Sequence, residues 1–342
     1  MIRLKDIAQK AGVSVMTVSK VLRDEPDISA ATKVRIRLLA QQMGYVPDRM
    51  AQALRGRSPR LFGLLIASPT NPVFVRIIMA IEQRAQELGY DLLIGHTLNE
   101  LAREEYYIRR FLSRRIDGLF LTPVYRMESE APAYEELARH RLPTVLLGHR
   151  APFCKQFANV GVDDLGASAI ATRHLIALGH RRIAFFAGPR VSPGAQERFN
   201  GYRLALKEAQ IPEDERLVFQ AGSTTEEGKS AALQLLNEAP HVTAVQTAND
   251  LVAIGAADIF LDQGIRIPEQ LSVVGFGNVL TSEYFRVPLT TIRQPKYQLG
   301  LAAVDIMLKL LQGQPPASKR LPAEIIVRKS TAPPCNKLEG ST

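Results

Sequence analysis

The segment 272–278 ends an apolar run in Gly-Phe-Gly-Asn, a composition typical of loops that bind nucleotide phosphates. In such loops backbone N–H groups hold the phosphate, and a third glycine allows the next helix to pack closely. Here Val279 and Leu280 follow, so only the first three positions of the pattern GxGxxG are met. The sequence also has no GxxxxGK[ST], no GxSxG and no His/Cys/acid cluster at metal-ligand spacing. The motifs therefore predict a protein that is not an enzyme and that needs no cofactor or metal.

Small and polar residues follow several other apolar runs of the sequence. Thr122 comes after 117–121, His149 after 143–148, and Asn249 after 243–248. Ligands of open parallel sheets bind beyond the carboxyl ends of the strands, where residues of this kind meet. The pattern predicts a cleft for a small molecule along this edge.

Short apolar runs alternate with amphipathic helical segments from Leu61 onward, which is typical of parallel sheets with crossover helices. The stretch is too long for one sheet, so we expect an α/β core at 61–335 made of two doubly wound parallel-sheet subdomains. We place one subdomain at about 61–160 plus 293–322 and the other at about 161–292 plus 323–335. A crossover between them is expected near 157–168.

The first 45 residues predict three short helices and no strand. Apolar residues recur at helical spacing in 4–11 and in 15–22, Gly12 separates these segments, and Ser14 is placed to cap the second. A third helix is expected to begin at a Ser29 cap. The predicted small core of this helix-turn-helix unit contains Ile7, Ala8, Val18, Val21, Val34, Leu38 and Tyr45.

Most of the net charge of +9 lies near the N-terminus, because residues 1–60 contain twelve Lys and Arg but five Asp and Glu. A compact basic module is typical of nucleic-acid binding, although an ordinary solvated basic surface has the same composition. The 46% hydrophobic content predicts a globular protein, and no apolar run is long enough to span a membrane. Residues 1–12 are charged where a secretion signal would be apolar, so we expect a cytoplasmic protein with Cys154 and Cys335 reduced.

The second predicted helix has features of a DNA-recognition helix. Ser14 and Thr17 can donate hydrogen bonds to phosphates, and Lys20 can reach guanine or phosphate. A helical hairpin without a DNA role would share the apolar spacing, but the location of the basic charge favours DNA recognition. The residues expected to point away from the small core are Val15, Met16, Thr17 and Lys20.

Over its whole length the chain resembles the lactose/galactose-repressor (LacI/GalR) family of bacterial transcription regulators. The resemblance rests on KDIAQKAGVSVMTVSKVL, MGYVPDRMAQALRG, GHRRIAFFAGP, TANDLVAIGA, SVVGFGN and PLTTIRQP, in this order. It implies a helix-turn-helix headpiece at 1–46, a hinge helix or linker at 47–60, and a core similar to periplasmic sugar-binding proteins. It also implies a homodimer that binds a palindromic operator in double-stranded DNA.

The resemblance implies roles for residues that would contact DNA. Val15, Met16 and Lys20 match base-reading positions, and the two apolar side chains favour contacts with thymine methyl groups. Leu54 matches the hinge leucine that wedges into the minor groove from both protomers and kinks the operator. The complete set expected at the DNA is Ser14, Val15, Met16, Thr17, Lys20, Ser29 and Leu54.

The resemblance also implies an effector site in the core cleft, for a sugar, a sugar acid or a sugar phosphate. Arg198 would bind adjacent hydroxyls or a carboxylate, Asn249 would form a hydrogen bond, and Phe74 would supply an apolar face. The implied effector contacts are Val73, Phe74, Thr122, His149, Gly194, Arg198, Ser223, Asn249, Gly277 and Gln294.

Gly277 departs from the family pattern, because many sugar-responsive relatives have an aspartate at this position. Without that acid Arg198 loses its expected counter-charge, and a buried unpaired guanidinium is unfavourable. One hypothesis is that the effector itself carries negative charge. The alternatives place the missing group on the protein, with Glu197, Asp250 or Glu283 as the acid, or with Asn278 accepting the hydroxyl contacts.

Together these features predict a sequence-specific DNA-binding transcription regulator, acting as a repressor and controlled by a small molecule in the cleft. A sugar-binding protein with the same core would carry a secretion signal in place of the basic headpiece. A sugar-processing α/β enzyme would need a catalytic set that the cleft positions lack. The tail after Thr331 has no leucine heptads, so a dimer is favoured over a tetramer joined by a C-terminal helix bundle.

Overall fold

The structure of the protein is a computed structural model that describes residues 2–45 and 59–335. The chain divides into two compact units, Met1–Pro59 and Arg60–Thr342. Leu54 and nearly all of the predicted hinge helix or linker lie outside the described residues. Within the described ranges, no helix is both long and apolar enough to cross a membrane.

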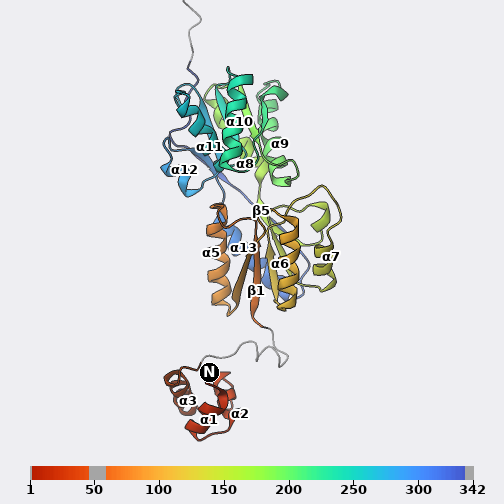
Figure 1. Ribbon diagram of the computed structural model, residues 1–342, viewed down its shortest axis with the longest axis vertical. Helices are drawn as coiled ribbons and strands as arrows, with labels where there is room; N and C mark the ends of the chain where they lie inside the picture. Colours follow the sequence, from red (N-terminus) through yellow and green to blue (C-terminus); the bar gives the residue numbers. More distant parts are fainter. Residues whose placement is uncertain (1, 46–58, 336–342) are drawn as a thin grey trace, which may run out of the picture. The chain divides into compact units, whose positions relative to one another are not determined.

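The first unit contains the three predicted helices, α1 (Leu4–Ala11), α2 (Val15–Leu22) and α3 (Ala30–Gln42) (Figure 1). Gly12 follows α1 with φ = 68°, a left-handed conformation that glycine adopts without strain. The Ser14 hydroxyl accepts a hydrogen bond of 3.0 Å from the backbone N–H of Thr17 and so caps α2. The helix-turn-helix prediction is confirmed.

The small core of the first unit differs from the prediction along α3. The predicted residues of α1 and α2 are buried, but Val34 and Leu38 are exposed, and Ile36 and Ala40 are buried instead. Both pairs have the spacing of one helical face, so apolar periodicity cannot separate them. Ile36 and Ala40 pack against the buried residues of α1 and α2, while Lys33 and Arg37 form ion pairs with the exposed Asp24 at 3.1 and 2.6 Å.

The second unit contains two six-stranded sheets. The first sheet has the strand order β11-β5-β4-β3-β1-β2, and every neighbouring pair is parallel. Its strands are β1 (Leu61–Ile66), β2 (Asp91–His96), β3 (Gly118–Leu121), β4 (Thr144–Leu147), β5 (Ala158–Val162) and β11 (Ser318–Leu321).

The second sheet has the order β12-β10-β9-β8-β6-β7 and is parallel except for the antiparallel pair β10 and β12. Its strands are β6 (Ile183–Ala187), β7 (Val218–Gln220), β8 (Ala244–Thr247), β9 (Ser272–Gly277), β10 (Thr290–Arg293) and β12 (Glu324–Ile326). The predicted fold class, two doubly wound sheets beside a small helical unit, is confirmed.

Helices cover both faces of each sheet, as Figure 1 shows. On the first sheet, α5 (Val73–Glu87) and α13 (Lys296–Leu311) pack opposite α6 (Leu101–Ser113) and α7 (Pro132–Arg139). On the second, α10 (Thr225–Glu238) and α11 (Asp250–Asp262) pack opposite α8 (Asp164–Ala177) and α9 (Pro193–Glu208). Short elements complete the unit: α12 (Leu280–Tyr284) and 3-10 turns at Pro152–Cys154 and Glu215–Leu217.

In the described part of the chain three connections join the two halves of the second unit, from β5 to α8, from β10 to α13 and from β11 to β12. The segment predicted as the crossover contains the first of these, and β5 extends to Val162, slightly beyond the expected subdomain boundary. Strands β11 and β12 were not predicted. Both are short edge strands, and β11 has the polar sequence Ser-Lys-Arg-Leu, so neither has the apolar run that marks a buried strand.

Candidate functional site

A cavity of about 480 Å³ lies at the carboxyl ends of strands from both sheets. Thr122 follows β3, His149 comes shortly after β4, and Gln294 follows β10, so the sheet topology brings these side chains to one place. Nine of the ten predicted effector contacts line the cavity, namely Val73, Phe74, Thr122, His149, Gly194, Arg198, Ser223, Asn249 and Gln294. Among the described residues, Gly277 is the predicted contact that is not part of the wall.

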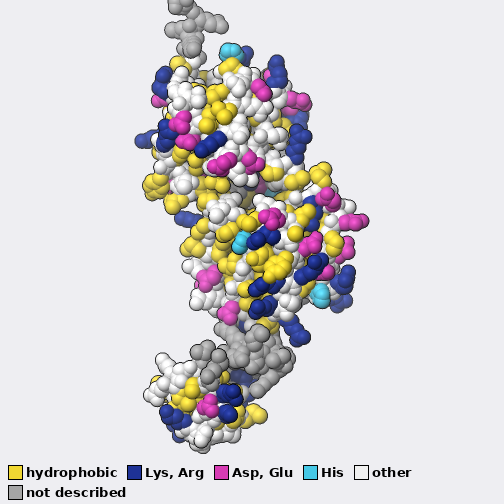
Figure 2. All heavy atoms as spheres, viewed as in Figure 1, with side chains coloured by type: hydrophobic (Ala, Val, Ile, Leu, Met, Phe, Trp, Pro, Cys, Tyr) yellow, Lys and Arg dark blue, Asp and Glu magenta, His cyan; other side chains and the backbone are white. Residues whose placement is uncertain are grey.

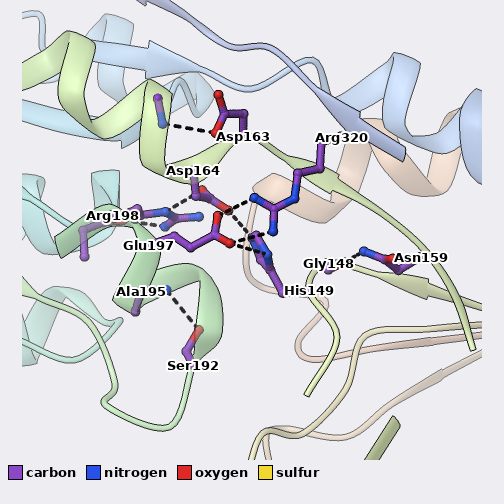
Figure 3. A network of polar contacts seen from close by, with 12 residues as sticks. Gly148, His149, Asn159, Asp163, Asp164, Ser192, Ala195, Glu197, Arg198 and Arg320 are labelled. Atoms are coloured by element: carbon purple, nitrogen blue, oxygen red, sulfur yellow. Dashed lines mark hydrogen bonds and ion pairs between the residues drawn. The ribbon is translucent and has the colours of Figure 1, made fainter. Parts of the chain in front are cut away.

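Arg198 has a counter-charge that the sequence reasoning missed. Its Nε donates a hydrogen bond of 2.8 Å to Oδ1 of Asp164, and its Nη1 donates one of 2.6 Å to the carbonyl of Ala248 (Figure 3). The guanidinium also lies 3.9 Å from the ring centroid of Phe276, a cation–π contact. The expectation of an unpaired Arg198 is therefore wrong, and so are Glu197, Asp250 and Glu283 as its paired acid.

Asp164 is buried in the first turn of α8, directly after the crossover from β5. Its Oδ1 accepts from Arg198, and its Oδ2 is 2.6 Å from Nε2 of His149. Burial alone would raise the pKa of the Asp164 carboxyl, but the Arg198 charge and the hydrogen bonds from His149 and Arg198 outweigh it and hold that pKa below 3.8. Asp164 is therefore an ionised acid within the cavity wall. Its signal in the sequence was a carboxylate shortly after the apolar segment 158–162.

A chain of polar contacts crosses from one half of the second unit to the other at this point (Figure 3). Nδ1 of His149 is 3.5 Å from Oε1 of Glu197, which lies on α9. Arg320, on β11, donates two hydrogen bonds to the same carboxylate, at 2.7 and 3.1 Å. His149 follows a strand of the first sheet and Arg320 lies on one, whereas Asp164 and Glu197 lie on helices that cover the second sheet. These contacts therefore depend on the relative position of the two halves.

Gly277 ends β9 next to the buried carboxylate of Asp250. A Cβ at position 277 would lie 3.4 Å from Oδ2 of Asp250, and φ is 142° there, so an aspartate would be strained and would face a like charge. Asp250 accepts hydrogen bonds from Thr291 Oγ1 at 2.5 Å and from Val279 N–H at 2.9 Å. Asp250 thus belongs to the packing around β9, and the role predicted for Gly277 in contacting the effector finds no support in this geometry.

Lys296, at the start of α13, is held against the end of β9. Its Nζ donates hydrogen bonds to the carbonyls of Gly277 at 2.5 Å and of Asn278 at 2.8 Å. Burial lowers the pKa of this amine to about 8, although the nearby Asp250 charge opposes the shift. The contact joins the two halves of the unit near the second connection between them.

Two polar groups of the cavity have donor or acceptor capacity left for a ligand. Oγ1 of Thr122 is buried, and it has no hydrogen-bond partner in the described structure. Oδ1 of Asn249 accepts from Val252 N–H at 2.9 Å and caps α11, which leaves the amide nitrogen of Asn249 as a donor at the cavity wall. Buried polar groups are normally paired, so a ligand or water is expected beside Thr122.

The loop 122–126, which includes Thr122 and Tyr125, is fixed by contacts with the buried Glu104 carboxylate. One carboxylate oxygen of Glu104 accepts hydrogen bonds of 2.7 Å from Val124 N–H and from the Tyr134 hydroxyl, and the other contacts the Arg126 guanidinium. Burial raises the pKa of Glu104, and these hydrogen bonds together with the Arg126 charge oppose the shift. Both oxygens of Glu104 are thus used to fix the loop that forms part of the cavity wall.

The predicted DNA contacts of the first unit have distinct environments. Val15 and Met16 are 46% and 63% exposed at the start of α2, as expected. Lys20 forms an ion pair with Asp27, so its ammonium is already partnered. Ser14 and Ser29 cap α2 and α3 through Thr17 and Thr32, and Leu54 lies outside the described residues.

The chain is similar in sequence to bacterial regulators. Residues 3–48 match the family described as bacterial regulatory proteins, lacI family, and residues 172–331 match the periplasmic binding protein-like domain. A curated relative is the HTH-type transcriptional regulator DegA of Bacillus subtilis (strain 168). It is 32% identical over 331 residues, which cover 96% of this chain and 97% of the relative.

Solved structures similar to this chain show the same architecture. The lac repressor dimer bound to operator and the anti-inducer ONPF has a TM-score of 0.86 and 29% identity, covering 97% of this chain and 99% of that one. The complex of the transcriptional regulator CelR with cellobiose has a TM-score of 0.73 and 28% identity, covering 96% of this chain and 100% of that one.

Proposed function

Because the chain belongs to the LacI family of bacterial regulatory proteins, we propose that it is a sequence-specific DNA-binding transcription regulator, and more narrowly a repressor. The observation that carries this proposal is the combination, in one chain, of a helix-turn-helix unit and a cavity between two doubly wound sheets, whose mainly apolar wall holds a few polar and charged side chains. In the cytoplasm the first unit binds an operator, and a small molecule in the cavity changes the affinity of that binding.

The start of α2 reads the operator through apolar contacts. Val15 and Met16 are exposed there, and such side chains pack on thymine methyl groups in the major groove. Lys20 contributes base or phosphate contacts once it exchanges its Asp27 partner for DNA. Since Ser14 and Ser29 already cap helices, the helix N-termini that they cap approach the phosphates.

The regulator acts as a homodimer, so that two copies of α2 reach the two halves of a palindromic site. The lac repressor relative is a dimer on its operator. In this chain Leu280 and Tyr284 on α12 are 72% and 76% exposed, and Val75 and Met79 on α5 are exposed as well. Figure 2 shows hydrophobic side chains exposed over α12. Apolar side chains gathered in this way favour a protein interface along α12 and α5.

The effector is a neutral sugar. The CelR relative was solved with cellobiose, and the cavity here offers hydroxyl, amide, imidazole and guanidinium groups beside the apolar Phe74. Because Asp164 balances the charge of Arg198, the hypothesis that the effector must bring negative charge loses its reason. Arg198 then donates to adjacent hydroxyls while its charge stays compensated.

Effector binding alters DNA binding through the polar contacts that join the two halves of the second unit at the cavity. A ligand that displaces His149 from Asp164, or Arg320 from Glu197, changes how the two halves of the second unit close on each other. The first sheet carries β1, which follows the chain segment from the DNA-binding unit. Closure therefore changes the position from which that segment departs.

The proposed function is tested with the full-length protein and a pool of random duplexes. Repeated selection on immobilised protein is expected to enrich a palindromic site, and a gel shift with that site gives the operator affinity. A panel of neutral sugars and their acids is then titrated into the complex. Failure to enrich any sequence would refute the proposed function, and a preference for the sugar acids would refute the neutral effector.

Replacing Leu54 with alanine is expected to weaken operator binding by about 1–3 kcal/mol, because the variant lacks the apolar wedge that opens the minor groove. Effector affinity should stay at the wild-type value, since the residues that line the described cavity all belong to the second unit of the chain. A gel shift measures the first quantity and calorimetry the second. Leu233→Ala, at an exposed leucine of α10, is the control and should leave operator binding unchanged. Equal operator affinities for the two variants would count against the hinge role of Leu54.

A further inference from the structure

The edge of the first sheet where its strands begin is rich in arginine. Arg60 directly precedes β1, and Arg114 and Arg115 lie between α6 and β3. Arg139 is the last residue of α7, and Arg141 lies between α7 and β4. These three strands are neighbours in the sheet order, and all five arginines are exposed. We call them the arginine edge. Figure 2 shows Lys and Arg side chains gathered over the ends of α6 and α7.

At three of the five positions of the arginine edge, the backbone has a conformation that favours glycine over arginine. Arg60, Arg115 and Arg141 have φ values of 51°, 52° and 51°, in the left-handed region that favours glycine. Elsewhere in this unit, four connections from a helix to a strand have glycine in the left-handed conformation, namely Gly89, Gly179, Gly264 and Gly313. A fifth connection has Gln210 in that conformation. A side chain kept against the backbone preference points to a function for that side chain.

Most of the arginine edge has no structural task. In the described part of the chain, the guanidinium groups of Arg114, Arg115, Arg139 and Arg141 form no ion pair and no hydrogen bond. Arg60 differs, because it donates to the carbonyl of Leu88 at 3.0 Å and stacks over Tyr90. The four other guanidinium groups are therefore available to an external anion.

The corresponding edge of the second sheet has a mixed charge. Arg181 and Arg182 precede β6, but Asp214 and Glu215 precede β7. At the arginine edge the carboxylates that stand at strand starts are Asp91 and Asp117, and Asp117 is occupied by the N–H of Leu61 at 2.9 Å. The positive charge is thus a property of one edge and not of parallel-sheet edges in this chain generally.

We propose that the arginine edge binds the phosphate backbone of duplex DNA at or beside the operator, in addition to the contacts of residues 1–45. The proposal rests on the proposed function. Its second support is chain connectivity, because β1 begins at this edge directly after residues 46–59, which join it to the helix-turn-helix unit. A segment of that length spans roughly 50 Å at most, so DNA held by the first unit stays within reach of the edge. The contacts carry no base specificity and add affinity through release of counterions.

The test uses the double variant Arg115→Gly with Arg141→Gly in the full-length protein. Glycine suits both left-handed positions, so the melting temperature should be unchanged or higher although two guanidinium groups are removed. Operator affinity is measured by gel shift or fluorescence anisotropy at salt concentrations from about 50 to 200 mM. The slope of log K against log salt should become shallower by about 0.9 for each phosphate that the variant no longer neutralises. For two to four such phosphates under a dimer, the ratio of wild-type to variant affinity should be roughly 10- to 100-fold larger at about 50 mM salt than at about 200 mM.

Three further variants make the result specific. Arg114→Gln with Arg139→Gln should change the slope in the same direction without touching a left-handed residue. Arg181→Gln with Arg182→Gln removes two exposed arginines from the second sheet and should leave the slope at the wild-type value. Gln210→Gly changes an uncharged left-handed residue and should also leave it unchanged.

Each outcome separates this inference from the proposed function. If the wild-type protein forms no specific operator complex, the proposed function is refuted, and the arginine edge loses its basis. If the complex forms but both arginine-edge variants keep the wild-type slope and affinity, only the role of the edge is refuted. A fall in affinity that is equally large at all salt concentrations would also refute phosphate binding, because it would show an interaction that is not governed by counterions.

Discussion

Replacing Asp164 with asparagine is expected to lower the free energy of unfolding by about 3–5 kcal/mol at neutral pH. The wild-type Asp164 carboxylate accepts a hydrogen bond from Arg198 and lies 2.6 Å from Nε2 of His149. The substitution removes its negative charge and leaves the Arg198 guanidinium uncompensated in the cavity wall. This is a large share of the ~5–15 kcal/mol by which domains are usually stable. Urea denaturation followed by circular dichroism measures the loss, and calorimetry with a bound sugar measures the expected fall in effector affinity.

The pH dependence of this effect has a definite sign. The folded state holds the pKa of Asp164 below its ordinary value of 3.8, so the ionised acid stabilises the fold. This contribution is complete above about pH 4 and is lost as the pH falls through the depressed folded-state value. The difference in unfolding free energy between the wild type and Asp164→Asn should therefore be constant near neutral pH and shrink on acidification below about pH 4.

Two controls separate the ion pair from the position of Asp164 at a helix start. Asp163→Asn keeps a side-chain oxygen that can cap Gly166 and is expected to have a small effect, because Asp163 is exposed. The double variant Asp164→Asn with Arg198→Met should recover part of the lost stability, since it removes the lone charge. If both losses simply add, the stabilisation comes from His149 or from the α8 dipole and not from Arg198.

Replacing Glu104 with alanine is expected to lower the free energy of unfolding by a similar amount, about 3–5 kcal/mol. The substitution leaves the Arg126 guanidinium, the Tyr134 hydroxyl and the N–H of Val124 without their shared acceptor in a buried site. It also releases the loop 122–126, so effector affinity should fall together with stability. Denaturation and calorimetry measure the two quantities on the same preparation.

The comparison variants for Glu104 test the shared-acceptor explanation. Glu104→Gln keeps an oxygen for Val124 and Tyr134 but removes the charge and the acceptor that Arg126 contacts. Its effect should be smaller than that of alanine, and the loss that remains measures the buried ion pair. Glu104→Leu combined with Arg126→Met replaces the buried ion pair with apolar groups and should be more stable than Glu104→Ala. A double variant as unstable as the alanine variant would mean that the loop depends on packing around Glu104 and not on its charge.

Local patterns in the sequence predict much of the fold. The bounds of α1 and α2, the Ser14 and Ser29 caps and the apolar runs of both sheets were expected and are found. These features depend on contacts between residues a few positions apart, which a one-dimensional pattern contains. The failures have the same physical origin: β11 and β12 have no apolar run, and the outward face of α3 has the same apolar spacing as its inward face.

Some residues of the candidate site could be predicted from the sequence pattern, and others could not. Thr122, His149 and Asn249 could be placed at the cavity because they follow strands, and the carboxyl ends of parallel strands lie at the same edge of a sheet. The role of Gly277 was inferred from resemblance, and the structure places it against Asp250 instead of in the cavity wall.

The sequence therefore sufficed to predict the helix-turn-helix unit, the doubly wound core, the family and the edge of the sheets at which the cavity lies. The charge balance within the cavity depended on the folded structure. Asp164 precedes Arg198 by 34 residues, and Glu197 is 123 residues from Arg320. Such partners meet only when the order of strands in each sheet, and the connections between the sheets, bring their ends together. Ion pairs of this kind depend on distance in space, and periodicity along the chain carries no information about that distance.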